Sequence, residues 1–518
     1  MLLGALLVSG RSTPPSSSAA APSPGRTARR AMEKLRVLTA PKGTGSLLCL
    51  APSPHDEGAT LAAAGEDGAA VVFDLRGDSL VAHRLSADAG CFSAGDAVTS
   101  VAYARAREHL LYCASGCVVT AWDLRAVPVA RAGVPAPDPD PIPADADAAA
   151  AAVARASIAD PTDRAANDPA PSAGGPAHRY AFNDDEINAV SVSARGDALC
   201  AADDSGAVVV VDVSHRAGFA GKLVKRLRGG HENIASGAVF RHHRPWDVIS
   251  GGLDCAVCKW DYSRGAPVAK WRVGELAAAE AAREAAHAGD DAPAAPSQMC
   301  NPPFVHAVAA WNEREEGERS EVAAAARRLV AAACGDGTVA LVDVDAPAPG
   351  TSGGTKKSGK KTKSKSKSKS KTKTNTNTNH TGGAEGGAED GGPFGGTRRA
   401  LFLGRAAGVG HASACSHATF PGWGGGALVL SGGNDRHVRL WDWRVAAREL
   451  RGDRDGDGDG DGDGDGDAGR TGGLVLSLKH GRKVNWLACG SGTGECPGGG
   501  DTFVADTSER VSVYAMRR

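Results

Sequence analysis

Residues 428–444 read LVLSGGNDRHVRLWDWR, and this stretch predicts the fold of the chain. The apolar run LVL at 428–430 is followed by GND at 433–435, a composition typical of a tight turn. After the turn, residues 437–440 alternate polar and apolar side chains, the period of two expected of a half-buried strand. We therefore predict two antiparallel strands, the second ending in Trp441-Asp442.

This stretch resembles a WD40 repeat, in which each repeat forms one four-stranded blade of a β-propeller. Asp435 precedes Trp441 by six residues, and Gly410-His411 lies upstream of both. A turn aspartate can accept hydrogen bonds from turn amides and from the histidine, while Trp441 would fill the gap between neighbouring blades. The resemblance implies an all-β propeller if the rest of the chain repeats the pattern.

Six further units repeat the pattern. The most complete contains His231, Asp254 and Trp260, whereas others keep only the turn aspartate, as at Asp67 and Asp336. Without the inserts the units average roughly 44 residues, within the usual WD40 spacing. We predict seven blades at about 35–76, 96–125, 178–213, 224–264, 300–345, 401–444 and 474–516, with the strand at 35–38 closing the last blade.

The remaining segments lack this periodicity and are expected to be disordered or low-complexity inserts at 126–177, 272–299, 346–397 and 445–471. Within the second insert, residues 274–288 are rich in helix formers without an apolar stripe, which favours a solvated helix. For residues 1–31 we favour an unstructured extension with Met32 as the functional start. The alternative is an organelle-targeting segment, because this stretch is rich in serine and arginine and lacks acids.

Composition limits the function classes. The net charge is −1, so no overall field points to nucleic acid or an anionic membrane. No apolar run approaches the roughly 18 residues of a membrane span. The 12 cysteines are scattered singly, as expected of reduced thiols in an intracellular protein. We therefore expect a location in the cytoplasm or nucleus.

No motif of an enzyme, metal or cofactor site stands out, so we predict a non-enzymatic protein without cofactor or metal. Cys255 and Cys258 have the spacing of half a zinc site, but we favour structural thiols. The alternating Asp-Gly run at 455–467 favours a solvated loop, with weak calcium binding as the alternative. The run at 356–373 holds ten lysines, which suits nuclear import, nucleic-acid contact or a solubilising tether.

Several short stretches resemble the WD repeat-containing protein 53 family more than WD40 repeats in general. They include DAVTSV at 96–101, HENI at 231–234 and HGRKVNWL at 480–487. That family also carries a lysine-rich insert, but there it follows the sixth blade, whereas here it precedes that blade. We therefore transfer no function with the insert.

Three blades end in an arginine two residues after an aspartate. The pairs are Asp74 with Arg76, Asp123 with Arg125 after Trp122, and Asp442 with Arg444. These motifs resemble those with which substrate receptors dock on the DNA-damage-binding adaptor of cullin-four ubiquitin ligases. The family resemblance points to Arg125 in particular.

An arginine at a strand end places its guanidinium fork on one rim, where it can engage carboxylates or carbonyls of a partner. The alternative is that each arginine pairs with an aspartate of the neighbouring blade. We predict a monomeric substrate receptor that holds the adaptor on this rim and recruits an unknown client on the opposite face. The alternative function is a nuclear assembly scaffold or nucleic-acid-associated protein that uses the lysine run at 356–373.

Overall fold

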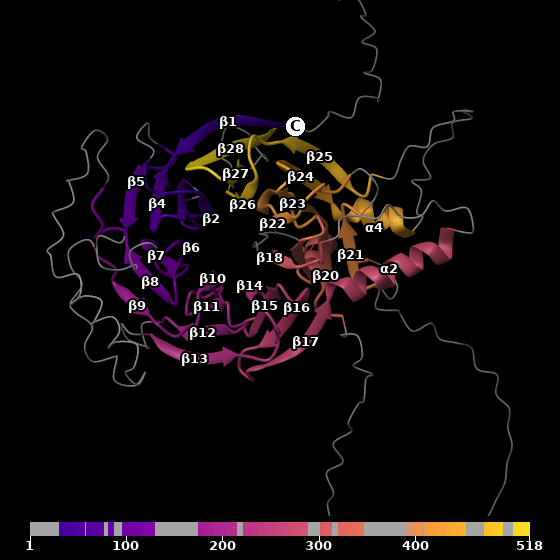
Figure 1. Cartoon of the computed structure of the whole chain (residues 1–518), viewed down its shortest axis with the longest axis horizontal. Coiled ribbons are helices and arrows are strands. Elements are labelled where there is room, and N and C mark those ends of the chain that lie inside the picture. The colour runs from indigo at the N-terminus through magenta and orange to yellow at the C-terminus, as the bar shows by residue number, and fades with distance from the viewer. Residues whose placement is uncertain are drawn as a thin grey trace, which may run out of the picture.

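The chain forms a ring of seven four-stranded antiparallel sheets (Figure 1), so the predicted all-β, seven-bladed propeller is confirmed. The structure, a computed structural model, describes residues 31–56, 59–76, 81–86, 96–129, 175–214, 221–288, 301–312, 320–346, 392–394, 398–405, 409–451, 471–490 and 501–517. The extension at 1–30, the lysine run at 356–373 and the Asp-Gly run at 455–467 lie outside these residues.

Within the first six blades the strands follow each other from the centre of the ring to its wall in chain order. The innermost strands are β2 (Leu47–Pro52), β6 (Val98–Tyr103), β10 (Ile187–Val192), β14 (Ala235–Phe240), β18 (Val305–Ala310), β22 (Cys415–Thr419) and β26 (Val484–Cys489). The second strands are β3 (Thr60–Gly65), β7 (Leu110–Ser115), β11 (Ala198–Asp203), β15 (Asp247–Gly252), β19 (Leu329–Cys334), β23 (Leu428–Gly433) and β27 (Asp501–Asp506).

The third and outer strands complete each blade. The third strands are β4 (Ala69–Asp74), β8 (Val118–Asp123), β12 (Val208–Asp212), β16 (Ala256–Asp261), β20 (Val339–Asp343), β24 (His437–Asp442) and β28 (Arg510–Arg517). The outer strands are β5 (Val81–Ser86), β9 (His178–Tyr180), β13 (Lys222–Leu227), β17 (Ala266–Arg272), β21 (Ala400–Leu403), β25 (Leu474–Lys479) and, in the last blade, β1 (Ala31–Thr39). In the described part of the chain the helices are α2 (Val273–Ala288), α3 (Glu321–Ala326), α4 (Trp443–Arg451) and the 3₁₀ turn η4 (Gly422–Gly424).

Strand β1 closes the ring by pairing with β28, so the first and last described strands lie side by side. Leu38 stands opposite Val511, and Thr39 stands opposite Arg510. The strand covers the predicted 35–38 and begins earlier, at Ala31. Strand β28 pairs with β27 on one edge, and β1 covers its other edge, which would otherwise be exposed.

The blade boundaries in the structure differ from the predicted ones. In several blades the outer strand follows a stretch of sequence that lacks the strand pattern. Strand β9 belongs to the second blade and not to the third, and β13, β21 and β25 likewise complete the blade before them. The hairpin between the third and fourth strands carries these inserts, so the sequence pattern stops before the blade does. The predicted units end at the third strand for this reason.

The expected inserts are partly ordered, in contrast to the prediction. Helix α2 spans the predicted helical stretch, but one side of it is not solvated. Arg398 donates from Nε to the buried Glu280 carboxylate at 2.8 Å, and Arg405 donates from Nη1 to the Ala277 carbonyl at 2.8 Å. Phe394 is fully buried, and α4 continues the sixth blade to Arg451. Apolar and charged contacts that join distant segments order these pieces, and periodicity within one segment cannot reveal such contacts.

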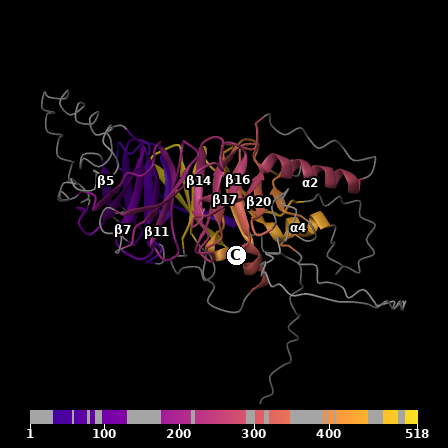
Figure 2. The same ribbon diagram turned by 90° about the horizontal axis from the view of Figure 1, so that it is seen from below.

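The two rims of the disc differ in the side chains that they carry. Neighbouring strands are antiparallel, so the first and third strands of a blade end on the same rim. We call it the arginine rim, because Arg76, Arg125 and Arg444 follow third strands there. The opposite rim precedes the first strands, and we call it the histidine rim after His231, His411 and His480. Figure 2 shows the disc from its side, with α2 and α4 projecting from one part of the wall.

Candidate functional site

Six third strands end in an aspartate that closes the turn after the strand. Its Oδ1 accepts a hydrogen bond from the backbone N–H two residues later, at distances from 2.8 to 3.1 Å. A short carboxylate is well suited to this local turn. The residue that donates the N–H is arginine in three blades, serine in two and aspartate in one. The six aspartates are Asp74, Asp123, Asp212, Asp261, Asp343 and Asp442.

The three arginines fold back on the aspartate of their own blade with one shared geometry. In Arg125, Nε donates to Asp123 Oδ1 at 2.9 Å and Nη2 donates to Oδ2 at 2.6 Å. Arg76 makes the same pair of bonds at 3.0 and 3.2 Å, and Arg444 makes them at 3.0 and 2.6 Å. The alternative of pairing with the neighbouring blade is therefore wrong, because the turn brings the side chain onto its own strand end.

These fixed guanidinium groups remain accessible. The side chains of Arg76, Arg125 and Arg444 are 64%, 68% and 42% exposed. The pKa of Asp123 lies below its ordinary value, mainly because Arg125 donates hydrogen bonds to the carboxylate. In each arginine the aspartate holds Nε and Nη2, and no hydrogen bond among the described residues uses Nη1.

The surroundings distinguish the three positions. Arg125 is followed by Val127, which is buried, and by Val129, which is 66% exposed. Arg76 stands at the same turn of the adjacent first blade. Arg444 lies in the first turn of α4, and its side chain is the least exposed of the three. Arg125 is thus the most exposed of the three arginines, and an exposed apolar residue follows it closely in the chain.

On the histidine rim, the fourth blade carries a buried chain of hydrogen bonds. His231 Nδ1 lies 2.9 Å from Asp254 Oδ1, and His231 Nε2 lies 2.7 Å from Ser250 Oγ. Trp260 Nε1 donates to the same Ser250 oxygen at 2.8 Å. Burial alone would raise the pKa of Asp254, but hydrogen bonds from His231 and Lys270 outweigh it and lower that pKa.

The sixth blade repeats this arrangement with His411, Asp435, Ser431 and Trp441 at 2.8–2.9 Å. The histidine, aspartate, serine and tryptophan of these two networks therefore hold the blade together and do not form an open site. Two other predicted turn residues differ, because no histidine stands four residues before the first strand of their blades, where His231 and His411 stand in the fourth and sixth blades. Asp336 instead accepts from the backbone and hydroxyl of Thr338 at 3.0 and 2.7 Å. The backbone N–H of Asp67 donates to the Thr44 carbonyl at 3.2 Å.

Sequence reasoning missed a variant of this network in the seventh blade. His480 Nε2 lies 2.8 Å from Asp506 Oδ2, and its Nδ1 lies 2.9 Å from the Tyr514 hydroxyl. In this blade the tyrosine hydroxyl is the second partner of the histidine, whereas in the other two blades that partner is a serine that also binds tryptophan. The histidine, 26 residues before the aspartate, was a signal that could have found the pair.

A buried charged cluster joins the fourth and fifth blades and was also missed. Arg241, whose side chain is fully buried, donates to Asp247 at 2.9 Å and to both oxygens of Asp345 at 2.8 and 2.7 Å. Lys259 reaches Asp345 at 2.9 Å and Asp247 at 3.3 Å. Asp345 occupies the position that arginine takes in the first, second and sixth blades. The fifth blade thus presents a carboxylate that its neighbour binds.

The cysteine pair is not arranged as half of a metal site. Cys255 lies in the turn before β16 with a φ of 57°, while Cys258 is buried within the strand. Among the described residues, no cluster of three or more His, Cys, Asp or Glu side chains could hold a metal ion. The described helices are also too short or too polar to cross a lipid bilayer.

Comparison with known proteins agrees with this architecture. The family described as WD domain, G-beta repeat matches residues 409–442, which include the network of the sixth blade. The WD repeat-containing protein 53 homolog of Dictyostelium discoideum is 28% identical over 166 residues. These residues make up 32% of this chain and 40% of that protein, so the match spans less than half of the relative's length. The chain is therefore a seven-bladed propeller whose residues 409–442 match the WD40 repeat, and it is similar to WD repeat-containing protein 53.

Proposed function

We propose that this propeller is a non-enzymatic substrate receptor of a cullin-four ubiquitin ligase. Arg125, with help from Arg76 and Arg444, would dock on the DNA-damage-binding adaptor of the ligase. The observation that supports this proposal is the shared geometry of three exposed guanidinium groups, each held by an aspartate of its own strand end. The WD40 fold itself is one of protein-interaction scaffolds.

The pairing with aspartate prepares the arginine for a partner. Arginine loses considerable side-chain freedom when it binds, and a side chain that is already ordered avoids that cost at the moment of association. Asp123 holds Nε and one Nη2 donor of Arg125, so the remaining donors point outward in a fixed direction. Val129, four residues after Arg125 in the chain, adds an exposed apolar side chain to this segment. Arg125 is therefore the residue that we expect to contribute most.

The test is recovery of the adaptor with purified variants of the full chain. We expect Arg125→Ala to reduce recovery strongly and Arg76→Ala to reduce it less. Arg264→Ala is the matched control, because Arg264 is 76% exposed and pairs with the strand-end Asp261 at 3.1 Å in a blade without the motif. Equal recovery with wild type and Arg125→Ala, or no recovery with either, would contradict the proposal.

Two further variants separate charge from geometry. Arg125→Lys keeps the positive charge but cannot make the two-pronged bond, so recovery should stay low. Asp123→Asn keeps the arginine but weakens its anchor, and we expect intermediate recovery. Full recovery with Arg125→Lys would mean that a positive charge alone is enough for docking. That result would contradict the proposed role of the two-pronged arginine bond.

We further propose that the protein acts as a monomer in the cytoplasm or nucleus. The lysine run at 356–373, on which the alternative as a nucleic-acid-associated scaffold depends, lies outside the described residues. Deleting that run should leave adaptor recovery unchanged. If adaptor recovery disappears with the run, the docking proposal is wrong and the alternative gains support.

A further inference from the structure

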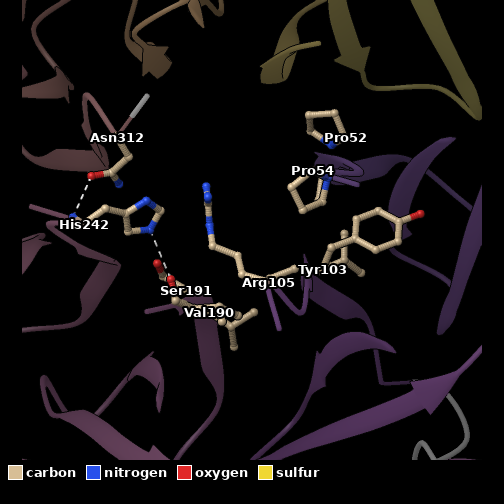
Figure 3. A pocket seen from close by; sticks show the side chains of 12 residues that line it. Pro52, Pro54, Tyr103, Arg105, Val190, Ser191, His242 and Asn312 are labelled. Atoms are coloured by element: carbon tan, nitrogen blue, oxygen red, sulfur yellow. Dashed lines mark hydrogen bonds between the residues drawn. The ribbon is translucent and has the colours of Figure 1, made fainter. Parts of the chain in front are cut away.

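Near the axis of the ring, the arginine rim has a pocket of about 240 Å³ (Figure 3). Its lining comes from the ends of β2, β6 and β10 and from residues after β14 and β18. The Asn312 side chain accepts from the His242 backbone N–H and donates to the Phe240 carbonyl, both at 2.9 Å. The His242 imidazole lies 3.3 Å from the Val192 carbonyl. These hydrogen bonds join neighbouring blades and stabilise the rim from within.

The opposite, histidine rim carries a group of exposed cations between the sixth and seventh blades. Arg436 lies in the turn between β23 and β24, Lys479 ends β25, and Arg482 and Lys483 precede β26. All four side chains are exposed. The two segments touch, because the His480 backbone N–H donates to the Arg436 carbonyl at 2.7 Å. We call these four residues the basic patch.

The carboxylates beside the basic patch are engaged elsewhere. Asp435 binds Arg439 at 2.8 Å, and Asp506 lies 2.8 Å from His480. Within the described residues, no ion pair includes a member of the basic patch. The remaining acid of the described turns is Glu509, which offsets one of the four positive charges. The patch therefore keeps a surplus of positive charge in a protein whose formal net charge is −1.

Arg436 occupies a backbone position that favours glycine. Its φ is 64°, in the left-handed region. The same turn position holds Gly68, Gly206 and Gly337 in the first, third and fifth blades, and Cys255 in the fourth. A residue with a side chain pays a conformational cost in this region, and such strain is common at functional sites. The guanidinium thus stands where glycine would be better for folding.

The first three blades give the same rim the opposite charge. Glu66 and Asp67 lie in the turn of the first blade, Asp96 precedes the second blade, and Asp185 and Glu186 precede the third; all are exposed. An acidic segment is repelled there and attracted by the basic patch, so it can lie on one part of the rim only. A nucleic acid would extend its phosphates over these carboxylates, whereas a short peptide fits within the patch.

We propose that the basic patch binds a segment of a client protein that is rich in aspartate and glutamate. Arg436 and Arg482 can each hold a carboxylate with two hydrogen bonds, and Lys479 and Lys483 add point charges. The inference rests on the proposed function, because it names the chemistry of the client that a substrate receptor would recruit opposite the adaptor. The binding itself does not need the adaptor.

The test uses the full chain with the ten lysines of 356–373 replaced by glutamine, so that acidic peptides cannot collect on that run. On an array of randomised octapeptides, this parent protein should prefer sequences rich in aspartate and glutamate. The double variant Arg482→Glu with Lys483→Glu should lose the preference. The matched control is Arg195→Glu with Lys222→Glu, which changes the net charge equally at exposed positions outside the histidine rim.

The tightest peptide is then measured in solution by fluorescence anisotropy. The double variant should weaken its binding roughly tenfold or more, because attractive charges become repulsive. Arg436→Gly should also weaken binding, yet it should melt no lower than the parent, because glycine suits the left-handed backbone. Cys255→Gly, at the same turn position of the fourth blade, is its control and should bind like the parent.

The proposal is overturned if the parent shows no acidic preference, if the control pair weakens binding as much as the double variant, or if Arg436→Gly binds like the parent. A DNA oligomer that binds as tightly as a peptide of equal charge would also overturn it, since the patch would then attract any polyanion. Adaptor recovery reports separately on the proposed function. The double variant should recover the adaptor normally, whereas unchanged recovery with Arg125→Ala would refute docking and leave the peptide result intact.

Discussion

At the scale of single residues, two neighbouring positions of the repeat have different roles. The aspartate at the end of the third strand accepts the same backbone N–H in six blades, so its role is structural. The residue two positions later is free to vary between arginine, serine and aspartate. In the second blade this position holds Arg125, whose side chain is exposed. In the fifth blade it holds Asp345, which forms an ion pair with the buried Arg241. A local motif can therefore predict the presence of the turn but not the destination of the variable side chain.

A serine that bridges histidine and tryptophan gives the first prediction for stability. Ser431 Oγ lies 2.8 Å from both His411 Nε2 and Trp441 Nε1. We expect Ser431→Ala to destabilise the protein by about 1–3 kcal/mol, because two buried polar groups lose their partner. A thermal melt measures this, and Ser250→Ala in the fourth blade should behave alike. Ser263→Ala, on an exposed turn, is the control, and an equal shift with all three would refute the argument.

His417 predicts a loss of stability in acid. The side chain is buried, and burial lowers its pKa from 6.5 to about 3. The unfolded chain therefore takes up a proton near pH 6.5, whereas the folded chain resists it until about pH 3. Stability falls as the pH drops through this window, by roughly 2 kcal/mol at pH 5 relative to pH 7 for this group alone.

The measurement compares urea denaturation of wild type and His417→Gln at pH 7 and pH 5. Glutamine can still accept the hydrogen bond from the Leu487 N–H that His417 Nδ1 receives at 3.4 Å. The variant should lose less stability on acidification than wild type. The histidines His242 and His243 still contribute to both proteins, since burial lowers their pKa values to about 4. Parallel losses in the two proteins would show that His417 is not responsible.

At the scale of elements, the third strand and its turn were the most predictable parts of each blade. Trp441, Trp260 and Trp122 mark strand ends that the structure places as expected. The outer strands were less predictable, because they are short, partly exposed and separated from the blade by inserts. Strand β13, for example, reads KLVKRL, and its charges protect an open edge more than they indicate a core.

Helices α2 and α4 share one arginine, and this link gives the next prediction. Arg398 binds Glu280 of α2 at 2.8 Å and the Leu450 carbonyl of α4 at 3.2 Å. Arg398→Met leaves a buried carboxylate with only Arg283, so we expect a loss of up to about 3–5 kcal/mol and faster amide exchange in α2. The double variant Arg398→Met with Glu280→Leu should recover much of the stability. A double variant that exchanges as fast as the single one would count against the ion pair.

At the scale of the whole molecule, the ring depends on a strand from the opposite end of the chain. A chain that starts at Met32 retains nearly all of β1, including the buried Leu38, whereas a chain that starts at Ala40 lacks this strand. We expect the first to melt like the full chain. The second should melt at a lower temperature and associate, because β28 then exposes an unpaired edge. Size-exclusion chromatography with a thermal melt distinguishes them, and identical behaviour would show that closure contributes little.

Because of where the long inserts lie, the propeller should keep its shape even when its backbone is cut. The gaps at 130–174, 347–391 and 452–470 each fall between the third and fourth strands of a single blade. A protease that cuts there would leave both flanking strands hydrogen-bonded in the same sheet. Three such cuts would give four fragments on a denaturing gel but one particle in solution. The propeller could thus be assembled from separately made pieces, and these sites are the natural positions at which to divide it.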